Sequence, residues 1–597
     1  MAEVHALNGF ILYNSFLSGY ESLSSKRDAL NAINVFPVAD GDTGSNMVST
    51  LYTTIRSPRV SRSLSSTLAS LADRALSGAR GNSGIILAQY LNSLAIECSN
   101  RETMTTEEFG QALINASVGT RKAVETPRDG TLITLLDVWS GEMYRLGRLA
   151  HDFNDVFVKS LDLARVALEK TRDQLEELRK AQVVDAGASG FVSFLEGIAV
   201  MILSGVVPQR PQTDLSEEAE SDHIHDIPVS SDTITYRYCT EALVLRPIDS
   251  PVLASDIHEK LRELGDSLIV TNGKTRTKLH IHTDKPSQFF FLLREAGTIE
   301  EQKVDDMRSQ FNSVHHPVSK IAIVTDSIAD IPSEMIDSLR IHVIPQKILW
   351  GKDEYLDRLT ITGDTFYPYL DERSDYPSSS VPDIKRVSQV FSWLSSHYDS
   401  IIAIPVAKAL SGTCQVFESA AVPLKSKGYP ISIVDSRLNS AAQGLTVLSA
   451  AQQAADGGSH EEILERLQTT IAGAKILVGV DTFKYMVRGG RVSVLKGAIA
   501  SFVNLKPIVS LDSTGRGTAF GASFSSKSSL AKILSHAKKD ISRIQKWAVV
   551  HASCPEKAAA FALEVSRVLG SEPEYIMEIS PLVGIHAGIG AVALAWI

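Results

Sequence analysis

The chain has 597 residues, too long for a single hydrophobic core, and this length predicts about three or four domains. Its 44% apolar and 21% charged residues are ordinary for a soluble globular protein, and a net charge of −10 argues against a nucleic-acid surface, which needs basic stripes. The four cysteines are scattered without a C-x-x-C pair, and the first residues form no basic and apolar leader, so we expect a reduced, cytoplasmic protein.

Residues 1–207 are predicted to form an all-α domain, because leucines and alanines such as Leu64, Leu68 and Leu71 recur at helical spacing. The most apolar run, 191–207, is short and contains Glu196. It therefore predicts a buried helix and no transmembrane segment.

Four polar, glycine-bearing loops interrupt these helices, at 34–47, 78–84, 129–131 and 185–190. Each loop alone could be only a helix cap and a turn. Four of them in one helical domain favour a shared rim, where backbone N–H groups converge on phosphates.

The first loop, Asn34–Met47, reads N-V-F-P-V-A-D-G-D-T-G-S-N-M. Asp40 and Asp42 flank a glycine, and two loop carboxylates at this spacing can both face Mg²⁺, which prefers oxygen ligands and shares them with phosphates. Small side chains and backbone N–H groups follow, on Thr43, Gly44, Ser45 and Asn46. For the letters D-G-D-T-G alone, a polar turn or a calcium-type loop is the commoner explanation.

The whole string closely resembles the signature of the dihydroxyacetone-kinase L-subunit (DAK2) family, the kinase half of bacterial fatty acid kinases. The resemblance implies that Asp40 and Asp42 hold Mg²⁺ ions bridging the phosphates of ATP. Related glycerone kinases carry a third aspartate where this chain has Val35, and Asn34 is the candidate substitute ligand. The family has similar loops at the same places in the chain, which implies nucleotide or metal–phosphate contacts for Ser83, Gly84, Thr131 and Asp185.

Residues 208–232 are predicted to be a linker, because they contain three prolines and a cluster of acidic residues with few apolar ones. From 233 to 310 the pattern changes to strands around an amphipathic helix at 251–265, with a hairpin turn at Asn272-Gly273. This pattern predicts a small α+β middle domain.

Two histidines of the middle domain, His280 and His282, stand at i and i+2 and therefore on one face of a strand. A surface pair is the more frequent explanation, but Cys239 on the first strand could complete a Cys-His-His set suited to Zn²⁺. The middle domain of fatty acid kinases has such a cysteine followed by H-I-H-T-D, so the resemblance favours a zinc site.

Residues 320–597 open as a βα series. Apolar strands at 321–325, 401–405 and 431–434 each lead through a polar turn into a helix, which predicts parallel α/β structure with ligands at the carboxyl ends of the strands. Ser411, Gly412 and Thr413 precede one helix and form either an anion site or a plain N-cap.

This segment resembles the DegV family of lipid-binding proteins, which carry fatty acids for the kinase and have a two-lobed α/β fold. The motifs are V-T-D-S-I-A-D-I-P at 324–332, S-S-V-P at 379–382, L-S-G-T at 410–413, R-G-G-R-V-S at 488–493 and H-A-G-I-G at 586–590. The resemblance implies a fatty carboxylate held by Ser380, Ser411, Gly412 and Thr413. It places Arg491 and His586 at the phosphoryl group. Val381 and Cys414 depart from the family's pattern.

Together these features predict a one-chain fatty acid kinase that uses Mg-ATP to make acyl phosphate and ADP. The alternatives are a kinase for a small polyol such as dihydroxyacetone, and a lipid-binding or regulatory protein without kinase activity. We expect fatty acid as ligand, a homodimer, an acyltransferase that consumes the acyl phosphate, and at most a transient contact with a membrane surface.

Overall fold

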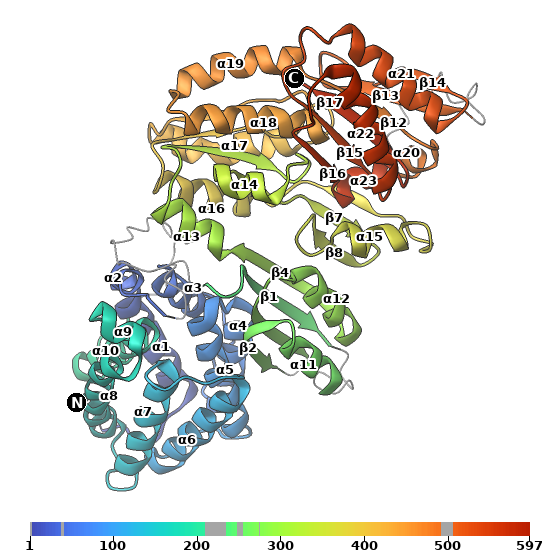
Figure 1. Ribbon diagram of the computed structural model, residues 1–597. Helices are drawn as coiled ribbons and strands as arrows, with labels where there is room; N and C mark the ends of the chain where they lie inside the picture. Colours follow the sequence, from blue (N-terminus) through green and yellow to red (C-terminus); the bar gives the residue numbers. More distant parts are fainter. Residues whose placement is uncertain (1–2, 37–40, 209–233, 247–254, 274, 491–504) are drawn as a thin grey trace. The chain divides into compact units, whose positions relative to one another are not determined.

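The computed structural model describes residues 3–36, 41–208, 234–246, 255–273, 275–490 and 505–597. The chain divides into two compact units, Met1–Phe311 and Asn312–Ile597, which are described separately (Figure 1). Asp40, Arg491 and residues 209–232 of the predicted linker lie outside the described residues.

The first unit begins with a bundle of helices around one hydrophobic core, as predicted. Leu64, Leu68 and Leu71 are all fully buried in that core, so the helical spacing in the sequence marks the inner face. The bounds are α1 (Gly9–Ser25), α2 (Arg27–Ala32), α3 (Thr43–Arg56), α4 (Leu64–Gly78), α5 (Gly81–Glu97), α6 (Thr106–Ala123), α7 (Leu132–Gly147), α8 (Phe153–Gln174), α9 (Glu176–Ala181) and α10 (Ala186–Ser204).

Among the described helices, α10 alone is long and apolar enough to cross a membrane on those two criteria, and 72% of the qualifying stretch is buried inside the protein. Its Glu196 pairs with Lys26 and Arg165 at 2.7 and 2.9 Å. A helix whose own residues are mostly buried is typical of the core of a helical bundle.

A four-stranded antiparallel sheet with the order β2-β3-β1-β4 follows in the same unit. The predicted hairpin is confirmed, since β2 and β3 pair on either side of residues 273–275. The bounds are β1 (Tyr238–Leu245), α11 (Ser255–Arg262), β2 (Gly265–Asn272), β3 (Arg276–Thr283), α12 (Pro286–Ala296), β4 (Thr298–Asp306) and α13 (Met307–His315).

The sheet packs directly against the helical bundle. Ile269 of β2 is 2% exposed and belongs to the core of the bundle, and it forms a β-bridge with Val124. Backbone N–H of Glu125 donates to Leu268 O at 3.1 Å, and Asn92 Nδ2 of α5 donates to Asn272 O at 2.7 Å. Shared apolar burial and these hydrogen bonds join the two parts into one unit.

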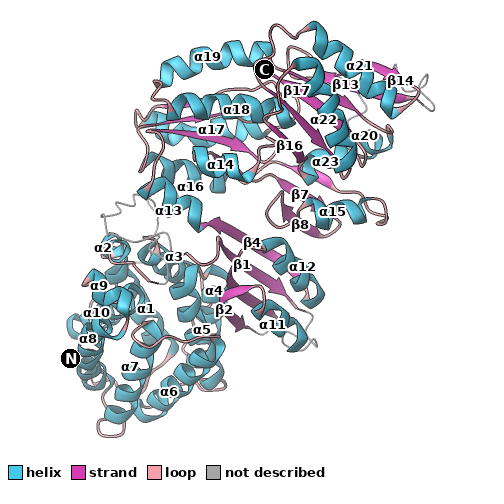
Figure 2. Cartoon of the chain, in the orientation of Figure 1, coloured by secondary structure: helices cyan, strands magenta, loops and turns pink. Residues whose placement is uncertain are grey.

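The described residues of the second unit form three sheets. Figure 2 shows their strands in magenta. The parallel sheet β11-β10-β5-β6 confirms the predicted α/β series, and β8-β7-β9 is antiparallel. The strands are β5 (Ile321–Asp326), β6 (His342–Ile344), β7 (Lys347–Trp350), β8 (Asp353–Leu356), β9 (Ser378–Ser380), β10 (Ser400–Ala403), β11 (Ile431–Ile433), β12 (Lys475–Gly479), β13 (Lys506–Leu511), β14 (Gly517–Ser523), β15 (Trp547–His551), β16 (Tyr575–Glu578) and β17 (Val592–Trp596).

The third sheet, β14-β13-β12-β17-β15-β16, is mostly antiparallel, with only β15 and β16 parallel. Strands in this segment were identified from the sequence only as far as residue 434, and this sheet was not predicted. The helices are α14 (Ser333–Leu339), α15 (Gly363–Leu370), α16 (Ile384–Ser395), α17 (Thr413–Ser426), α18 (Ser440–Ala455), α19 (His460–Gly473), α20 (Lys484–Arg488), α21 (Ser526–Lys539), α22 (Pro555–Leu569) and α23 (Pro581–Ala587).

Helix α18 joins the parallel sheet to the third sheet, because it packs against β5 as well as β12, β15 and β17. It is rich in alanine and buried on nearly all faces. A β-carbon at Gly444 would lie 2.5 Å from Asp330 O and 2.7 Å from Tyr575 Oη, so only glycine allows this packing.

Candidate functional site

The four glycine-bearing loops of the bundle lead into the N-termini of α3, α5, α7 and α10, and these ends lie side by side. A β-carbon at Gly187 would lie 2.6 Å from Ser83 Oγ and 3.4 Å from Leu132 Cβ. Gly81 has a φ of +59°, and a β-carbon there would collide with Asn46. The loops therefore form one rim, toward which four helices direct their positive ends.

Asp185 holds two of these helix starts together. Its carboxylate accepts from Ala188 N at 2.7 Å and also from the backbone N–H of Leu132. Burial raises the pKa of Asp185 to about 6, although the two hydrogen bonds act in the opposite direction. The described contacts of the carboxylate are thus structural, between α7 and α10.

A cavity lies where this rim faces the sheet of the middle domain. One wall of the cavity comes from the helical bundle and the other from the sheet. The lining residues are Asn34, Asp42, Thr43, Asn46, Gly81, Asn82 and Ser83 from the bundle, and Cys239, His280, His282 and Lys303 from the sheet. The candidate nucleotide residues and the candidate zinc residues therefore border the same space.

Asp42 stands at the N-cap of α3, but its side chain makes no capping hydrogen bond. That role falls to Asn31, which accepts from Ser45 N at 3.0 Å and donates to Ser45 Oγ at 2.9 Å. Asp42 also borders the cavity, and its carboxylate offers oxygen atoms of the kind that Mg²⁺ prefers as ligands.

Several predicted nucleotide residues do not line the cavity. A β-carbon at Gly44 would collide with Arg27 O, and one at Gly84 would collide with Thr50 Oγ1, so both glycines permit close packing of helices. Thr131 Oγ1 donates to Arg128 O at 2.8 Å. These contacts shape the rim, and direct contact with nucleotide remains a prediction for these residues.

Cys239, His280 and His282 come together on the sheet, with one candidate ligand atom from each within 4.8 Å of the others. Cys239 on β1 is paired in register with His282 on β3, and the two imidazole rings have centroids 5.0 Å apart. A thiolate with two imidazoles is a donor set that suits Zn²⁺.

Each imidazole also has a carboxylate beside its Nδ1 atom. Asp266 Oδ1 lies 3.4 Å from His282 Nδ1, and Glu241 Oε1 lies 3.8 Å from His280 Nδ1. His280 Nε2 is buried and has no hydrogen-bond partner among the described residues. Burial lowers the pKa of His280 to about 4, which keeps the ring neutral. These features fit a bound metal ion, whose histidine ligands typically donate their second N–H to a carboxylate.

Glu241 was not recognised in the sequence, and it connects the two walls of the cavity. The side chain is 1% exposed, and its Oε1 atom accepts from Gly81 N, at the start of α5, at 2.9 Å. Lys278 Nζ lies 3.2 Å from Oε2. Burial alone would raise the pKa of Glu241, but Lys278 and Lys303 outweigh it and hold the pKa well below its ordinary value. A glutamate directly before the apolar run Ala242–Leu245 of β1 was the signal available.

The candidate carboxylate site of the second unit lies at the start of α17. Ser411 Oγ and Thr413 Oγ1 are 2.8 Å apart, and Thr413 N donates to Ser411 Oγ at 3.3 Å. A β-carbon at Gly412 would contact Val381 at 3.4 Å, which brings the end of β9, with Ser380, next to this turn. The predicted residues from two separate motifs are thus adjacent.

His586 lies in the last turn of α23. A β-carbon at Gly489 would lie 2.5 Å from His586 Nδ1, so the first glycine of the R-G-G-R motif packs against His586. Helix α23 also contacts β9. The motifs around Ser380, Gly489 and His586 therefore meet at α23.

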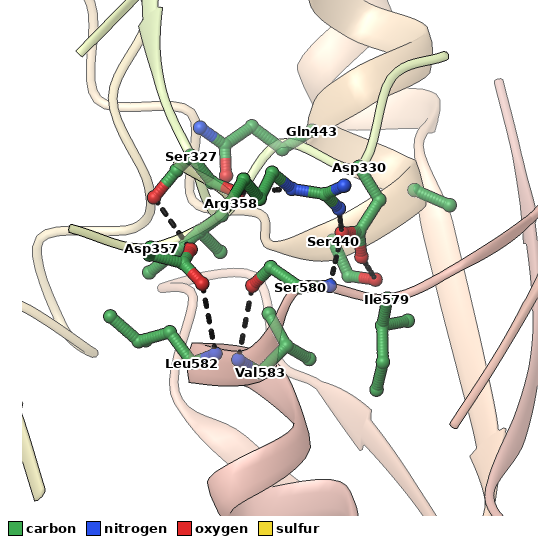
Figure 3. Close-up of polar contacts among 12 residues, drawn as sticks. Ser327, Asp330, Asp357, Arg358, Ser440, Gln443, Ile579, Ser580, Leu582 and Val583 are labelled. Atoms are coloured by element: carbon green, nitrogen blue, oxygen red, sulfur yellow. Dashed lines mark hydrogen bonds and ion pairs between the residues drawn. The ribbon is translucent and has the colours of Figure 1, made fainter. Parts of the chain in front are cut away.

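A buried polar network holds the first turn of α23 (Figure 3). Asp330 accepts from Ser580 N at 2.9 Å and from Ser440 Oγ at 2.5 Å, and it forms an ion pair with Arg358. Asp357 accepts from Leu582 N at 3.2 Å. Two buried carboxylates thus bind the free N–H groups of this helix start, which fixes the position of the helix that carries His586.

Three family models match successive parts of the chain. Residues 37–200 match the DAK2 domain, 235–314 match the fatty acid kinase A-like middle domain, and 320–597 match the uncharacterised DegV family. The chain therefore joins a DAK2 domain, a fatty acid kinase A-like middle domain and a DegV-family domain in one polypeptide, which confirms the resemblances. The combination relates it to fatty acid kinases.

An uncharacterised protein of Staphylococcus epidermidis is 29% identical over 364 residues, which cover 57% of this chain and 65% of the relative. Protein YloV of Bacillus subtilis is 28% identical over 330 residues, which cover 54% and 59%. The chain thus spans less than two thirds of the length of either relative. The crystal structure of DegV, a fatty acid binding protein from Bacillus subtilis, is 28% identical and covers 47% of this chain and 99% of its own, with a TM-score of 0.43.

Asp330→Ala is expected to lower the free energy of unfolding of the second unit by about 3 kcal/mol, because it leaves Arg358 and the N-terminus of α23 without their buried acceptor. Urea unfolding followed by tryptophan fluorescence measures this, since four of the five tryptophans follow residue 312. The control is Asp399→Ala, an exposed aspartate 3.8 Å from Lys320. Equal unfolding midpoints for the two variants would contradict the assigned role.

Purified protein is expected to contain about one zinc ion per chain, lost in Cys239→Ser, His280→Ala and His282→Ala alike, because each removes one of three protein ligands. Elemental analysis after dialysis measures the content. His258→Ala, on α11 and outside the cluster, is the matched control and should keep its metal. Zinc retained in all three ligand variants would exclude this site.

Proposed function

We propose that the protein is a fatty acid kinase. It transfers the γ-phosphoryl group of ATP to the carboxylate of a fatty acid held by the DegV-family domain. A carboxylate oxygen forms the new bond to phosphorus, the bond from phosphorus to the β–γ bridging oxygen breaks, and ADP leaves with that electron pair. The product is an acyl phosphate.

The observation that carries this proposal is the cavity between the DAK2 domain and the middle domain. It gathers the Asp42 carboxylate, polar side chains such as Asn46 and Ser83, and the positive ends of α3 and α5. Such a set suits a nucleotide phosphate with its metal ion. The DegV-family domain supports a fatty acid as the phosphoryl acceptor, because the hydroxyl groups of Ser411 and Thr413 lie together there.

The acceptor needs no strong general base, because a fatty carboxylate is already ionised at pH 7. The protein therefore has to position the two groups and offset charge. Ser411 and Thr413 would donate hydrogen bonds to the carboxylate, and Asn46, Asn82 and Ser83 would orient the phosphates. Mg²⁺ held by Asp40 and Asp42 would offset the charge of the transferring phosphoryl group.

The remaining predicted site residues would contact the phosphoryl group or hold a zinc ion. His586, fixed by the network at α23, and Arg491 would contact the phosphoryl group at the acceptor. A zinc ion at Cys239, His280 and His282 would supply positive charge beside the nucleotide cavity.

The proposed product is a reactive mixed anhydride. We therefore expect an acyltransferase to consume it, a homodimeric kinase, and a cytoplasmic location where ATP and Mg²⁺ are available.

Asp42→Asn is expected to lower acyl-phosphate formation by at least about 100-fold, because a charged metal ligand contributes several kcal/mol to the transition state. The measurement is ADP release with Mg-ATP and oleate. Bound fatty acid, measured by mass spectrometry of native protein, should be unchanged. Asp28→Asn, at an exposed position on α2, should behave as wild type. Wild-type turnover in Asp42→Asn would refute the assignment.

Ser411→Ala is expected to weaken oleate binding about 10- to 100-fold, the usual effect of losing a hydrogen bond to a charged group. Fluorescent fatty acid displacement measures the affinity. Ser426→Ala, at the exposed far end of the same helix, is the control, since its hydroxyl donates only to Val422 O. Unchanged affinity in Ser411→Ala would place the carboxylate elsewhere.

A further inference from the structure

Lys303 is a feature of the cavity that neither the motifs nor the proposed mechanism uses. It lies on β4, the edge strand of the middle sheet, and lines the cavity opposite the helix starts of the DAK2 domain. Among the lining residues that the structure describes, Lys303 is the only lysine or arginine.

The position of Lys303 is unusual for a lysine on an edge strand. Such a side chain can extend into solvent at no cost, yet the Lys303 side chain is only 25% exposed. Nζ lies 2.7 Å from Asp305 Oδ2, and Lys303 is paired in register with the buried Glu241. These two carboxylates keep the ammonium group charged at the wall of the cavity.

Asp305 accounts for one of the three donors of an ammonium group. Glu241 is already bound by Lys278 and by Gly81 N. Lys303 thus retains donor capacity toward a cavity that otherwise presents Asp42, amides, hydroxyls and the Cys-His-His cluster. The bundle wall supplies amides and a metal ligand, and the sheet wall supplies the cation.

We propose that Lys303 is a catalytic residue that contacts the terminal phosphate of the bound nucleotide, so that the middle domain completes the nucleotide site. This inference rests on the proposed function, because it requires that the cavity bind ATP. Lys303 would donate to a γ-phosphoryl oxygen and offset the negative charge of the group during transfer. A terminal phosphate carries the negative charge and the acceptor oxygens that the remaining N–H donors of this ammonium group can bind.

The test is equilibrium binding without fatty acid and without turnover. Isothermal titration calorimetry with Mg²⁺ compares ADP with the β,γ-imido analogue of ATP, which carries the terminal phosphate and is not hydrolysed. Lys303→Met should weaken binding of the analogue about 10- to 100-fold and that of ADP much less, since only the analogue loses a charge-assisted hydrogen bond. Lys303→Arg, which keeps the cation, should recover most of the difference.

Lys278→Met is the matched control, since it removes a buried lysine of the same sheet that binds Glu241 but does not line the cavity. It should affect both nucleotides equally. Zinc content and thermal unfolding identify any variant that fails to fold, and Lys303→Gln, which also removes the positive charge, then replaces Lys303→Met in the comparison. The inference would be overturned if Lys303→Met weakened the binding of both nucleotides equally. It would also be overturned if Lys303→Met still bound the analogue in preference to ADP as wild type does. Wild-type protein that binds neither nucleotide would instead overturn the proposed function.

Discussion

The hydrogen bond from Gly81 N to the buried carboxylate of Glu241 is the contact on which the candidate site depends. It joins the start of α5, inside a glycine-bearing loop of the DAK2 domain, to β1, an inner strand of the middle sheet. A carboxylate that is 1% exposed is stable only with compensating partners, and Lys278 and Gly81 provide them. Any displacement of the sheet from the bundle would break the hydrogen bond between Gly81 N and this buried carboxylate, so the two walls of the cavity hold each other in place.

This coupling also explains why two apparently separate sites share one space. The Cys239, His280 and His282 cluster belongs to the same sheet face as Glu241, and the Asp42 loop belongs to the same rim as Gly81. A metal ion at the cluster would border the same cavity as Asp42. The middle domain therefore supplies one wall of the candidate site, and is more than a connector between a DAK2 domain and a DegV-family domain.

The second unit uses buried charge in a similar way. Asp330 and Asp357 lie in the interior, where burial raises the pKa of both carboxyl groups, that of Asp357 to about 6. Asp330 forms an ion pair with Arg358, and the two carboxylates accept hydrogen bonds from backbone N–H groups at the start of α23. The helix that carries His586 is thus fixed by a polar network. Buried hydrogen bonds need particular partners in particular directions, so they define the position of the helix more narrowly than apolar contacts would.

Much of this organisation could be read from the chain alone. Helical spacing predicted the bundle, the βα series predicted the parallel sheet, and the string from Asn34 to Met47 predicted a DAK2 domain. These are local signals, since periodicity and short motifs are properties of neighbouring residues. The mostly antiparallel third sheet was missed, because its strand order is decided by pairing between distant segments.

The sequence by itself determined which residue types are present in each motif, and therefore the classes of domain. Only the tertiary structure decided which of them face one cavity. It separated Asp42, Asn46 and Ser83, which line the cavity, from Gly44 and Gly84, which serve close helix packing. It also added Glu241 and Lys303, which no motif marks. The physical reason is that burial and charge pairing depend on what packs across from a side chain, and in a long chain those neighbours come from segments far away in sequence.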